Sequence, residues 1–103
     1  MFFVVFITCP TYEEGEKIAR VLLEERLAAC VNITSDIKSF FWWEGKIQEA
    51  DEVLLIVKTK KSVLKDLIKK VKSIHSYSVP EIIALPITGG SKDFTKWIDE
   101  ETR

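Results

Sequence analysis

Cysteine, histidine, proline and glycine are all scarce in this chain, and it has no long apolar run. Its 103 residues include two cysteines, one histidine, three prolines and four glycines. Two cysteines are too few for a disulfide scaffold, so we expect reduced thiols in a cytosolic setting. No apolar run approaches the ~18 residues that span a membrane. The apolar start, Phe2–Ile7, lacks the basic flank and the cleavage site of a signal peptide, so we expect none.

An excess of one charge sign is also missing. Fifteen Lys and Arg residues oppose 16 Asp and Glu residues, which gives a net charge of −1. This balance provides no general attraction to nucleic acid or to acidic lipid. Seven lysines lie between positions 58 and 72, but they fall between apolar helix positions. The strand before them also lacks the stacking aromatics of RNA-recognition domains. We therefore expect a solvated lysine-rich face and no nucleic-acid or membrane partner.

Hydrophobic residues, in contrast, are plentiful and make up 47% of the chain. That fraction is enough for a real core. No linker, repeat or low-complexity segment divides the sequence, and about 100 residues is an ordinary size for one domain. We predict a single domain over residues 1–103.

The spacing of hydrophobic residues predicts a series of strands and helices. Thr11 and Glu14 form a capping box, in which the hydroxyl accepts from an orphan N–H and the carboxylate reaches back. A helix then runs from Tyr12 to about Arg26, and helical spacing recurs over residues 64–74 and in a short helix near residues 94–98. Strands are expected at residues 2–8, 28–33, 37–43, 46–60 and 82–87, the last with an edge-strand proline, Pro86. The order is the βαββαβ pattern of ferredoxin-like folds, an α+β sandwich with helices on one face of a four-stranded antiparallel sheet.

The two middle strands are predicted to form a long hairpin. Glu44-Gly45 suits a two-residue turn, and the arm from Lys46 to Lys60 would span roughly 50 Å if it were extended throughout. Side chains alternate along a strand, so we expect one pair of the aromatic run Phe40–Trp43 to enter the core and the other to need a partner. Exposed aromatics and free strand edges are costly in a soluble monomer, so we expect an oligomer. The alternative is a long arm that bends over its own sheet.

Polar side chains gather where the second helix gives way to the last strand. The only histidine, His75, is followed by Tyr77 and Glu81, and Pro80 stiffens the connection. His75 serves either as a neutral imidazole ligand for a metal or as a hydrogen-bonding residue at a helix end. Tyr77 and Glu81 either form a relay or ligand pair with it or close hydrogen bonds across a subunit seam.

Several segments together resemble the CutA divalent-cation-tolerance family. They are Leu27–Ile33 (LAACVNI), Trp42–Ile47 (WWEGKI), Lys58-Thr59, His75–Ile82 (HSYSVPEI) and Pro86-Ile87 before a final Trp97. The resemblance covers the chain from about Phe3 to Trp97. It implies a ferredoxin-like protomer, a homotrimer joined edge to edge by strands, and an association with tolerance of copper and other divalent metals in the cytoplasm.

The resemblance also implies a metal role for His75 and Cys30, and we add Glu81 as a ligand that a cleft between subunits brings near. Cys30 is a soft ligand suited to Cu(I) or zinc, although its place in a strand also suits an inert buried thiol. Cys9 lies at a strand end before Pro10, where we expect it to be accessible as a candidate additional thiol.

Four further residues are expected to line the cleft: Tyr77, Lys58, Glu52 and Trp43. Lys58 and Glu52 lie on the long third strand. Their alternative is an ordinary surface charge pair, worth roughly 0 to 1 kcal/mol. We expect Trp43, with Trp42, to pack at the subunit interface and not to stack on a ligand.

No enzyme motif is present, since Gly89-Gly90 lacks the strand–loop–lysine context of a phosphate-binding loop. We therefore predict a protein that is not an enzyme. The leading hypothesis is a cytoplasmic homotrimer that binds copper or another divalent metal weakly between subunits and contributes to metal tolerance. The alternative is a trimeric signalling or scaffold module whose cleft takes a small anionic ligand or a protein partner, by analogy with trimeric nitrogen-signalling proteins.

Overall fold

A computed structural model describes residues 1–103 and contains seven elements in the predicted order. The strands are β1 (Phe2–Cys9), β2 (Cys30–Trp43), β3 (Lys46–Lys60) and β4 (Ile82–Ile87), and the helices are α1 (Tyr12–Glu24), α2 (Lys61–Ile74) and α3 (Lys92–Glu101). The sheet order is β2-β3-β1-β4, and every neighbouring pair is antiparallel. The predicted ferredoxin-like α+β fold is thereby confirmed.

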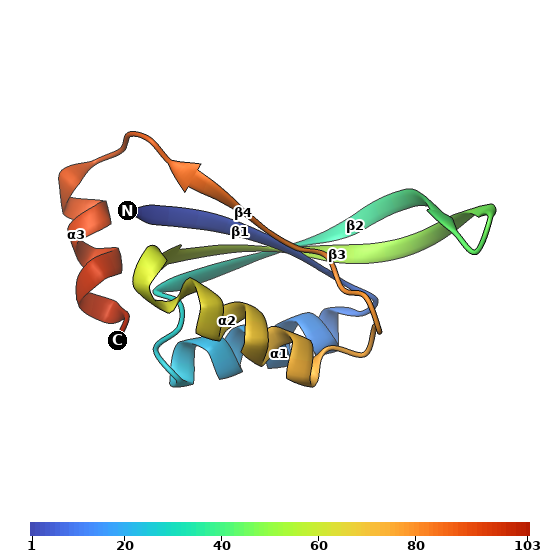
Figure 1. Ribbon diagram of the computed structural model, residues 1–103, viewed down its shortest axis with the longest axis horizontal. Helices are drawn as coiled ribbons and strands as arrows, with labels where there is room; N and C mark the ends of the chain where they lie inside the picture. The colour runs from blue at the N-terminus through green and yellow to red at the C-terminus, as the bar shows by residue number, and fades with distance from the viewer.

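The core lies between the sheet and the layer formed by α1 and α2 (Figure 1). Alternate residues of β1 and β3 face these helices, because successive side chains of a strand point to opposite faces. The buried cluster consists of Val5, Ile7, Cys9, Ile18, Leu22, Leu27, Ala28, Val53, Leu55, Val57, Val63, Leu67 and Val71. The core thus ends near Val53, well before the tip of the hairpin. None of the three helices has the length and apolar character of a membrane-crossing segment.

Helix α1 ends two residues earlier than predicted. Arg26 adopts a left-handed conformation with a φ of 58°. Its N–H donates to the Leu23 carbonyl at 3.1 Å, and the Leu27 N–H donates to the Leu22 carbonyl at 2.9 Å. This is the Schellman pattern of helix ends, in which glycine is the usual left-handed residue. Because arginine stands in its place, residue type carries little signal for this helix end.

Strand β2 is continuous, whereas two separate extended segments were predicted. The segment Thr34–Asp36 is a bulge inside the strand. The pairing register with β3 shifts between Thr34 and Ile37, and Asp36 has a φ of 61°. Bulges increase the local twist of a strand, and this one lies where the hairpin leaves the helical layer.

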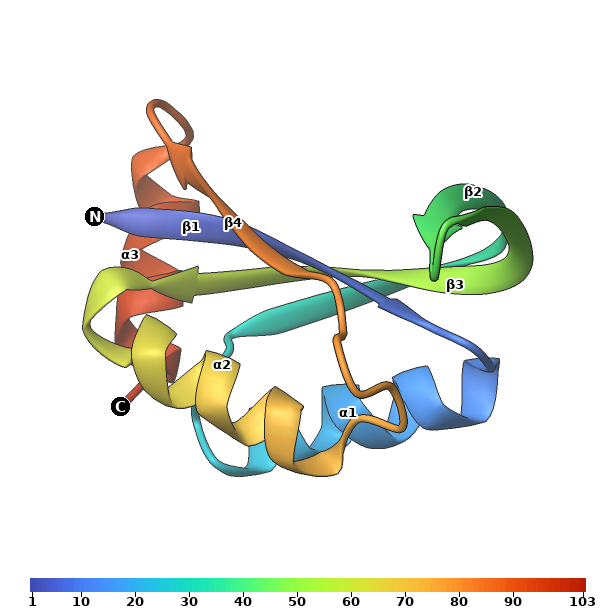
Figure 2. The ribbon, with the colours of Figure 1, turned by 45° about the vertical axis from the view of Figure 1, so that its right-hand side comes forward.

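The β2–β3 hairpin projects past the helices, and its tip curls (Figures 1 and 2). The longest extent of the whole molecule is 44 Å, less than a straight β3 alone would need. The prediction that one aromatic pair enters the core is wrong, because Phe40, Phe41, Trp42 and Trp43 are 64%, 41%, 72% and 45% exposed. They pair with residues 46–49 of β3, beyond the reach of α1 and α2.

The sheet face opposite α1 and α2 is only partly covered. Phe6, Leu54 and Ile56 are half-buried on this face, and Ile83 and Leu85 of β4 are exposed. Strands β2 and β4 each pair on one side only, in agreement with the edge position predicted from Pro86. A single chain therefore leaves an apolar sheet face and two strand edges without a partner.

Candidate functional site

Three parts of the chain that are distant in sequence meet at one end of the sheet, where β1 stops and β4 starts. Strand β1 ends at Cys9, α1 begins after its N-cap residue Thr11, and α2 ends before His75. Because β4 is antiparallel to β1, with Ile82 opposite Ile7, the α2–β4 loop returns to the end of the sheet at which β1 stops. Figure 1 shows this loop beside the β1–α1 connection. The fold therefore brings the predicted junction residues up against the end of β1.

His75 joins the end of α2 to β1 through both of its ring nitrogens. The ring is fully buried. Nε2 donates to the Thr8 carbonyl at 2.8 Å, and Nδ1 accepts from the Tyr77 backbone N–H at 3.0 Å. This bonding pattern fits a neutral imidazole with its proton on Nε2. Of the two roles predicted for His75, hydrogen bonding at a helix end is the one that these contacts provide within one chain.

Glu14 of α1 faces the same histidine. Its backbone N–H donates to the Thr11 Oγ1 at 3.1 Å, as the capping box predicted. Its carboxylate does not reach back to the N-cap, however. Glu14 Oε2 instead accepts from the Ser76 backbone N–H at 3.0 Å and lies 3.4 Å from His75 Nδ1. The α2–β4 loop offers a free N–H at this point, and the carboxylate bonds to it.

The prediction that Cys9 is accessible is wrong, because the side chain is fully buried. It belongs to the core face of β1, and α1 passes over it at Gly15. Burial, together with the charges of Glu14 and Glu52, raises the pKa of the Cys9 thiol to about 12. The group is thus a thiol at neutral pH. Ligand atoms of Cys9, Glu14 and His75 all lie within 4.8 Å of one another.

A groove of about 890 Å³ runs between the curled hairpin and the α2–β4 loop. The hydroxyl of Tyr77 donates to Glu52 Oε2 across it at 2.7 Å. The lining contains three carboxylates and no lysine or arginine; its residues are Thr8, Ser39, Phe40, Phe41, Trp43, Gln48, Glu49, Ala50, Glu52, Ser76, Tyr77, Ser78, Val79, Pro80 and Glu81. The groove therefore combines aromatic walls with negative charge.

Two groups in the groove hold their protons more tightly than usual. Burial and the charge of Glu52 raise the pKa of Glu81. Burial, the hydrogen bond to Glu52 and the same charge raise the pKa of Tyr77 well above its ordinary value. Burial is the larger cause of both shifts, and the nearby Glu52 carboxylate adds to it.

Two of the predicted metal ligands, Cys30 and His75, lie apart within one chain. Cys30 pairs with Lys58 on β3, whereas Cys9 pairs with Val53, five residues away. That separation corresponds to roughly 17 Å along the strand. His75 thus lies beside Cys9, and Cys30 lies in the region of Lys58.

The predicted cleft residues separate in a similar way. Tyr77, Glu52, Trp43 and Glu81 all line the groove, but Lys58 does not. Its Nζ donates to Asn32 Oδ1 and lies 3.9 Å from the sulfur of half-buried Cys30. Lys58 and Glu52, which were predicted to flank one cleft, therefore lie at different sites along β3: Glu52 lines the groove and Lys58 lies beside Cys30.

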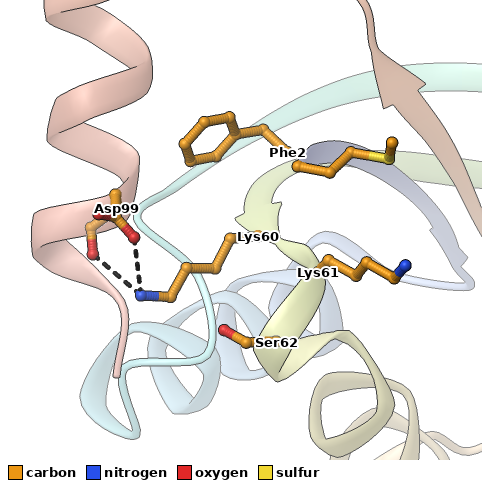
Figure 3. A pocket seen from close by; sticks show the side chains of 6 residues that line it. Phe2, Lys60, Lys61, Ser62 and Asp99 are labelled. Carbon is orange, nitrogen blue, oxygen red and sulfur yellow. Dashed lines mark hydrogen bonds and ion pairs between the residues drawn. The ribbon is translucent and has the colours of Figure 1, made fainter.

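A second hollow, of about 510 Å³, lies where β3 runs into α2 beside α3 (Figure 3). Lys60 points across it and donates to the Asp99 carbonyl at 3.2 Å and to Asp99 Oδ1 at 3.0 Å. Its charge is already paired. We therefore regard this hollow as the place where α3 is anchored to the sheet, with no ligand assigned to it.

Glu14 is the site residue that was not predicted from the sequence. A signal for it existed in the predicted topology. In a βαββαβ fold the last strand is antiparallel to the first. The end of β1, the start of α1 and the end of α2 therefore lie at the same end of the sheet. Thr11 and Glu14 mark the start of α1, which places Glu14 within one helical turn of that end of the sheet.

The sequence and the structure both match proteins of known family. The family described as CutA1 divalent ion tolerance protein matches residues 3–101. A protein of Archaeoglobus fulgidus named divalent-cation tolerance protein CutA is 54% identical over 96 residues, which cover 93% of each chain. A protein of Arabidopsis thaliana named protein CutA, chloroplastic, is 50% identical over 100 residues, 97% of this chain and 55% of that protein. The chain spans about half the length of the plant relatives that it matches.

Two solved structures show the same arrangement of elements. The divalent cation tolerance protein (Cut A1) of Thermus thermophilus superposes with a TM-score of 0.98 at 46% identity, covering 100% of both chains. The structure named periplasmic divalent cation tolerance protein CutA from Archaeoglobus fulgidus gives a TM-score of 0.95 at 52% identity, covering 98% of both. Since the family matches residues 3–101, and sequence and fold agree with its members along nearly the whole chain, this protein belongs to the CutA1 divalent ion tolerance family.

Proposed function

We propose that this chain works as a homotrimer in divalent-cation tolerance. In the same proposal, copper or another divalent metal binds weakly in the acidic groove, where subunits meet. The observation that carries the proposal is the hairpin. Its four consecutive aromatics, Phe40–Trp43, are exposed in a single chain, and three of them form a wall of the groove. A partner that covers the hairpin would also complete the groove.

Three features support assembly. The hairpin projects past its own helical layer, the sheet face opposite α1 and α2 is apolar and half-open, and strands β2 and β4 have free edges. Free edges add strands from other chains, and apolar faces of this kind mark interaction sites. The count of three chains rests on the family resemblance.

Carboxylates in the groove favour a cation as its ligand. Glu49, Glu52 and Glu81 line it without a compensating lysine or arginine. The charge of Glu52 already raises the pKa of Glu81, and a divalent cation between the two would remove that repulsion. The same charges disfavour the alternative of a small anionic ligand. A set made only of oxygen atoms, without imidazole or thiolate, binds copper weakly.

The remaining parts of the proposal concern Cys30, location and catalysis. Cys30, for which the family resemblance implies a metal role, would take part only if a neighbouring chain brought it to the groove. Both cysteines are free thiols, which suits a reducing compartment such as the cytoplasm. We propose no catalysis, because the raised pKa values keep Cys9 and Tyr77 protonated and therefore poor as nucleophile and base.

Sedimentation velocity and copper calorimetry test the proposal together. We expect a particle of three chains at micromolar concentration, and Cu²⁺ binding that weakens in Glu81→Gln. Asp51→Asn is the matched control, since the Asp51 side chain is 88% exposed on the hairpin and does not line the groove. Cys30→Ser tests the predicted soft ligand. A single-chain particle, or equal copper affinity in Glu81→Gln and the wild type, would overturn the proposal.

A further inference from the structure

One carboxylate of the groove is buried without a positive charge beside it. Glu52 is only 8% exposed, and it takes part in no ion pair of the chain. Its one hydrogen-bond partner is the Tyr77 hydroxyl, which donates to Oε2 at 2.7 Å. A carboxylate that is removed from water is costly unless a cation or several hydrogen bonds compensate its charge. Glu52 therefore lacks a counter-charge, and its own chain does not supply one.

The second oxygen of Glu52 is open to the groove. No group of the chain donates to Oε1, and no side-chain oxygen of the chain is both sealed from solvent and without a partner. Oε1 is therefore reached through the groove that Glu52 lines. Glu81 adds a second unpaired carboxylate to the lining, whereas Glu49 is partly compensated by Lys38 Nζ, 3.5 Å from its Oε1. The uncompensated negative charge is thus concentrated at Glu52 and Glu81.

Much of the remaining lining is apolar, and a metal ion makes no use of it. Phe40, Phe41 and Trp43 line the groove from the hairpin, and Val79 and Pro80 line it from the α2–β4 loop. A metal ion keeps its oxygen ligands and gains nothing from such surface. An organic cation buries its hydrocarbon part against these side chains, and its charge is attracted to the faces of aromatic rings. Aromatic rings beside carboxylates therefore favour an organic ammonium ligand.

The size of the groove and its open acceptor define the ligand further. A volume of about 890 Å³ lies in the range of small-molecule sites and is far larger than a single ion fills. Glu52 Oε1 accepts hydrogen bonds. A primary ammonium group has N–H donors for it, as a lysine side chain does, whereas a quaternary ammonium group has none. The groove thus fits a primary amine that carries an aliphatic body.

We propose that the groove is a site for a small aliphatic primary amine in its protonated form. Glu52 and Glu81 hold the ammonium group, and Phe41 and Trp43 contact the hydrocarbon chain. The inference rests on the groove of the proposed function but on none of its metal chemistry. An amine and a divalent cation would share the two carboxylates and so exclude each other. Only the amine uses the aromatic side chains, so these side chains distinguish the two ligands.

Calorimetric titration of the full chain with n-hexylammonium at pH 7 tests this site. Two matched probes separate its parts: n-hexanol has the same chain without the charge, and methylammonium has the charge without the chain. We expect n-hexylammonium to bind at least tenfold more tightly than either probe. Equal affinity for n-hexanol would mean that the carboxylates do not contribute, and equal affinity for methylammonium would mean that the aromatic side chains do not. Either result refutes the proposal.

Two variants assign the binding to the groove. Glu52→Gln keeps an oxygen that accepts from the Tyr77 hydroxyl but loses the charge, and it should weaken n-hexylammonium binding at least tenfold. Trp43→Leu should also weaken it while leaving Cu²⁺ binding unchanged, and Trp97→Leu is the control, because this half-exposed tryptophan of α3 lies outside the groove.

Indole N–H signals in NMR spectra of the wild type locate the amine without any substitution in the groove. We expect the amine to move the Trp43 signal and to leave the Trp97 signal in place. An unmoved Trp43 signal, or equal amine affinity in Glu52→Gln and the wild type, overturns the amine site. Failure of the metal proposal is distinguishable from this result, because Cu²⁺ calorimetry of Glu81→Gln and the sedimentation experiment decide it.

Discussion

Replacing Trp42 by alanine is expected to weaken the proposed assembly strongly. Trp42 is 72% exposed in the single chain, the largest fraction among the four hairpin aromatics. A tryptophan presents up to about 250 Å², so about 180 Å² remains to be covered by a partner. At ~25 cal/mol per Å² this area is worth about 4.5 kcal/mol if the coverage is complete. Half of that coverage gives about 2 kcal/mol, or roughly a 30-fold change in the dissociation constant for each subunit contact.

Sedimentation velocity over a dilution series measures this change. Guanidinium is added at the concentration where the wild type begins to dissociate, so that an increase in dissociation becomes visible. Tyr12→Ala is the control, because Tyr12 is also a half-exposed aromatic but lies on α1, away from the hairpin. If Trp42→Ala and the wild type dissociate at the same concentration, the hairpin is not the seam between subunits. Exposed aromatics would then be no evidence for an oligomer.

Three further predictions concern single groups. Glu52→Gln should lower the pKa of Tyr77 only part of the way to its ordinary value, because burial is the largest cause of the elevation; alkaline titration of tyrosinate absorbance measures this, and an unchanged midpoint would contradict it. The raised pKa of Glu81 stabilises the fold fully below the unfolded value near 4.5, and this contribution is lost as pH rises through the folded value. Glu81→Gln should therefore melt at a higher temperature than the wild type at pH 7 and at a similar temperature at pH 3.5, and a lower melting temperature at pH 7 would show that the Glu81 charge stabilises the fold. Thr59→Val leaves a buried backbone carbonyl without the hydroxyl that donates to it at 2.6 Å; guanidinium unfolding should show a loss of about 1–3 kcal/mol, and a neutral effect would mean that the carbonyl finds another donor.

Most of the fold could be predicted because its elements follow local patterns. Apolar runs mark β1 and the inner half of β3, and helical spacing marks α1 and α2. The errors fall where backbone conformation departs from what residue type suggests. Arg26 and Asp36 adopt left-handed conformations that glycine usually provides, so neither the end of α1 nor the bulge in β2 had a clear signal.

Burial was harder to predict than secondary structure. Cys9 was expected at an accessible strand end, but α1 passes over it. One pair of the hairpin aromatics was expected to enter the core, but the helices end before they can cover any of the four. Both errors concern which element lies above a given residue, and alternation along a strand does not contain that information.

The candidate site was predictable only in its local part. His75, Tyr77 and Glu81 are neighbours in sequence, so their junction was recognisable without a structure. Glu14 and Cys9 reach His75 through the antiparallel pairing of β1 with β4. The separation of Cys30 from His75 likewise depends on strand register, which sets a distance that residue types alone do not.

Tyr77 joins the groove to the buried histidine behind it. Its backbone N–H bonds to the His75 ring, while its hydroxyl bonds to Glu52 in the groove. A cation at Glu52, as proposed for the groove, would compete with the second bond and so loosen the residue that makes the first. Occupancy of the groove would then reach the core through a single side chain, and by thermodynamic linkage the bond at His75 would in turn alter the affinity of the groove.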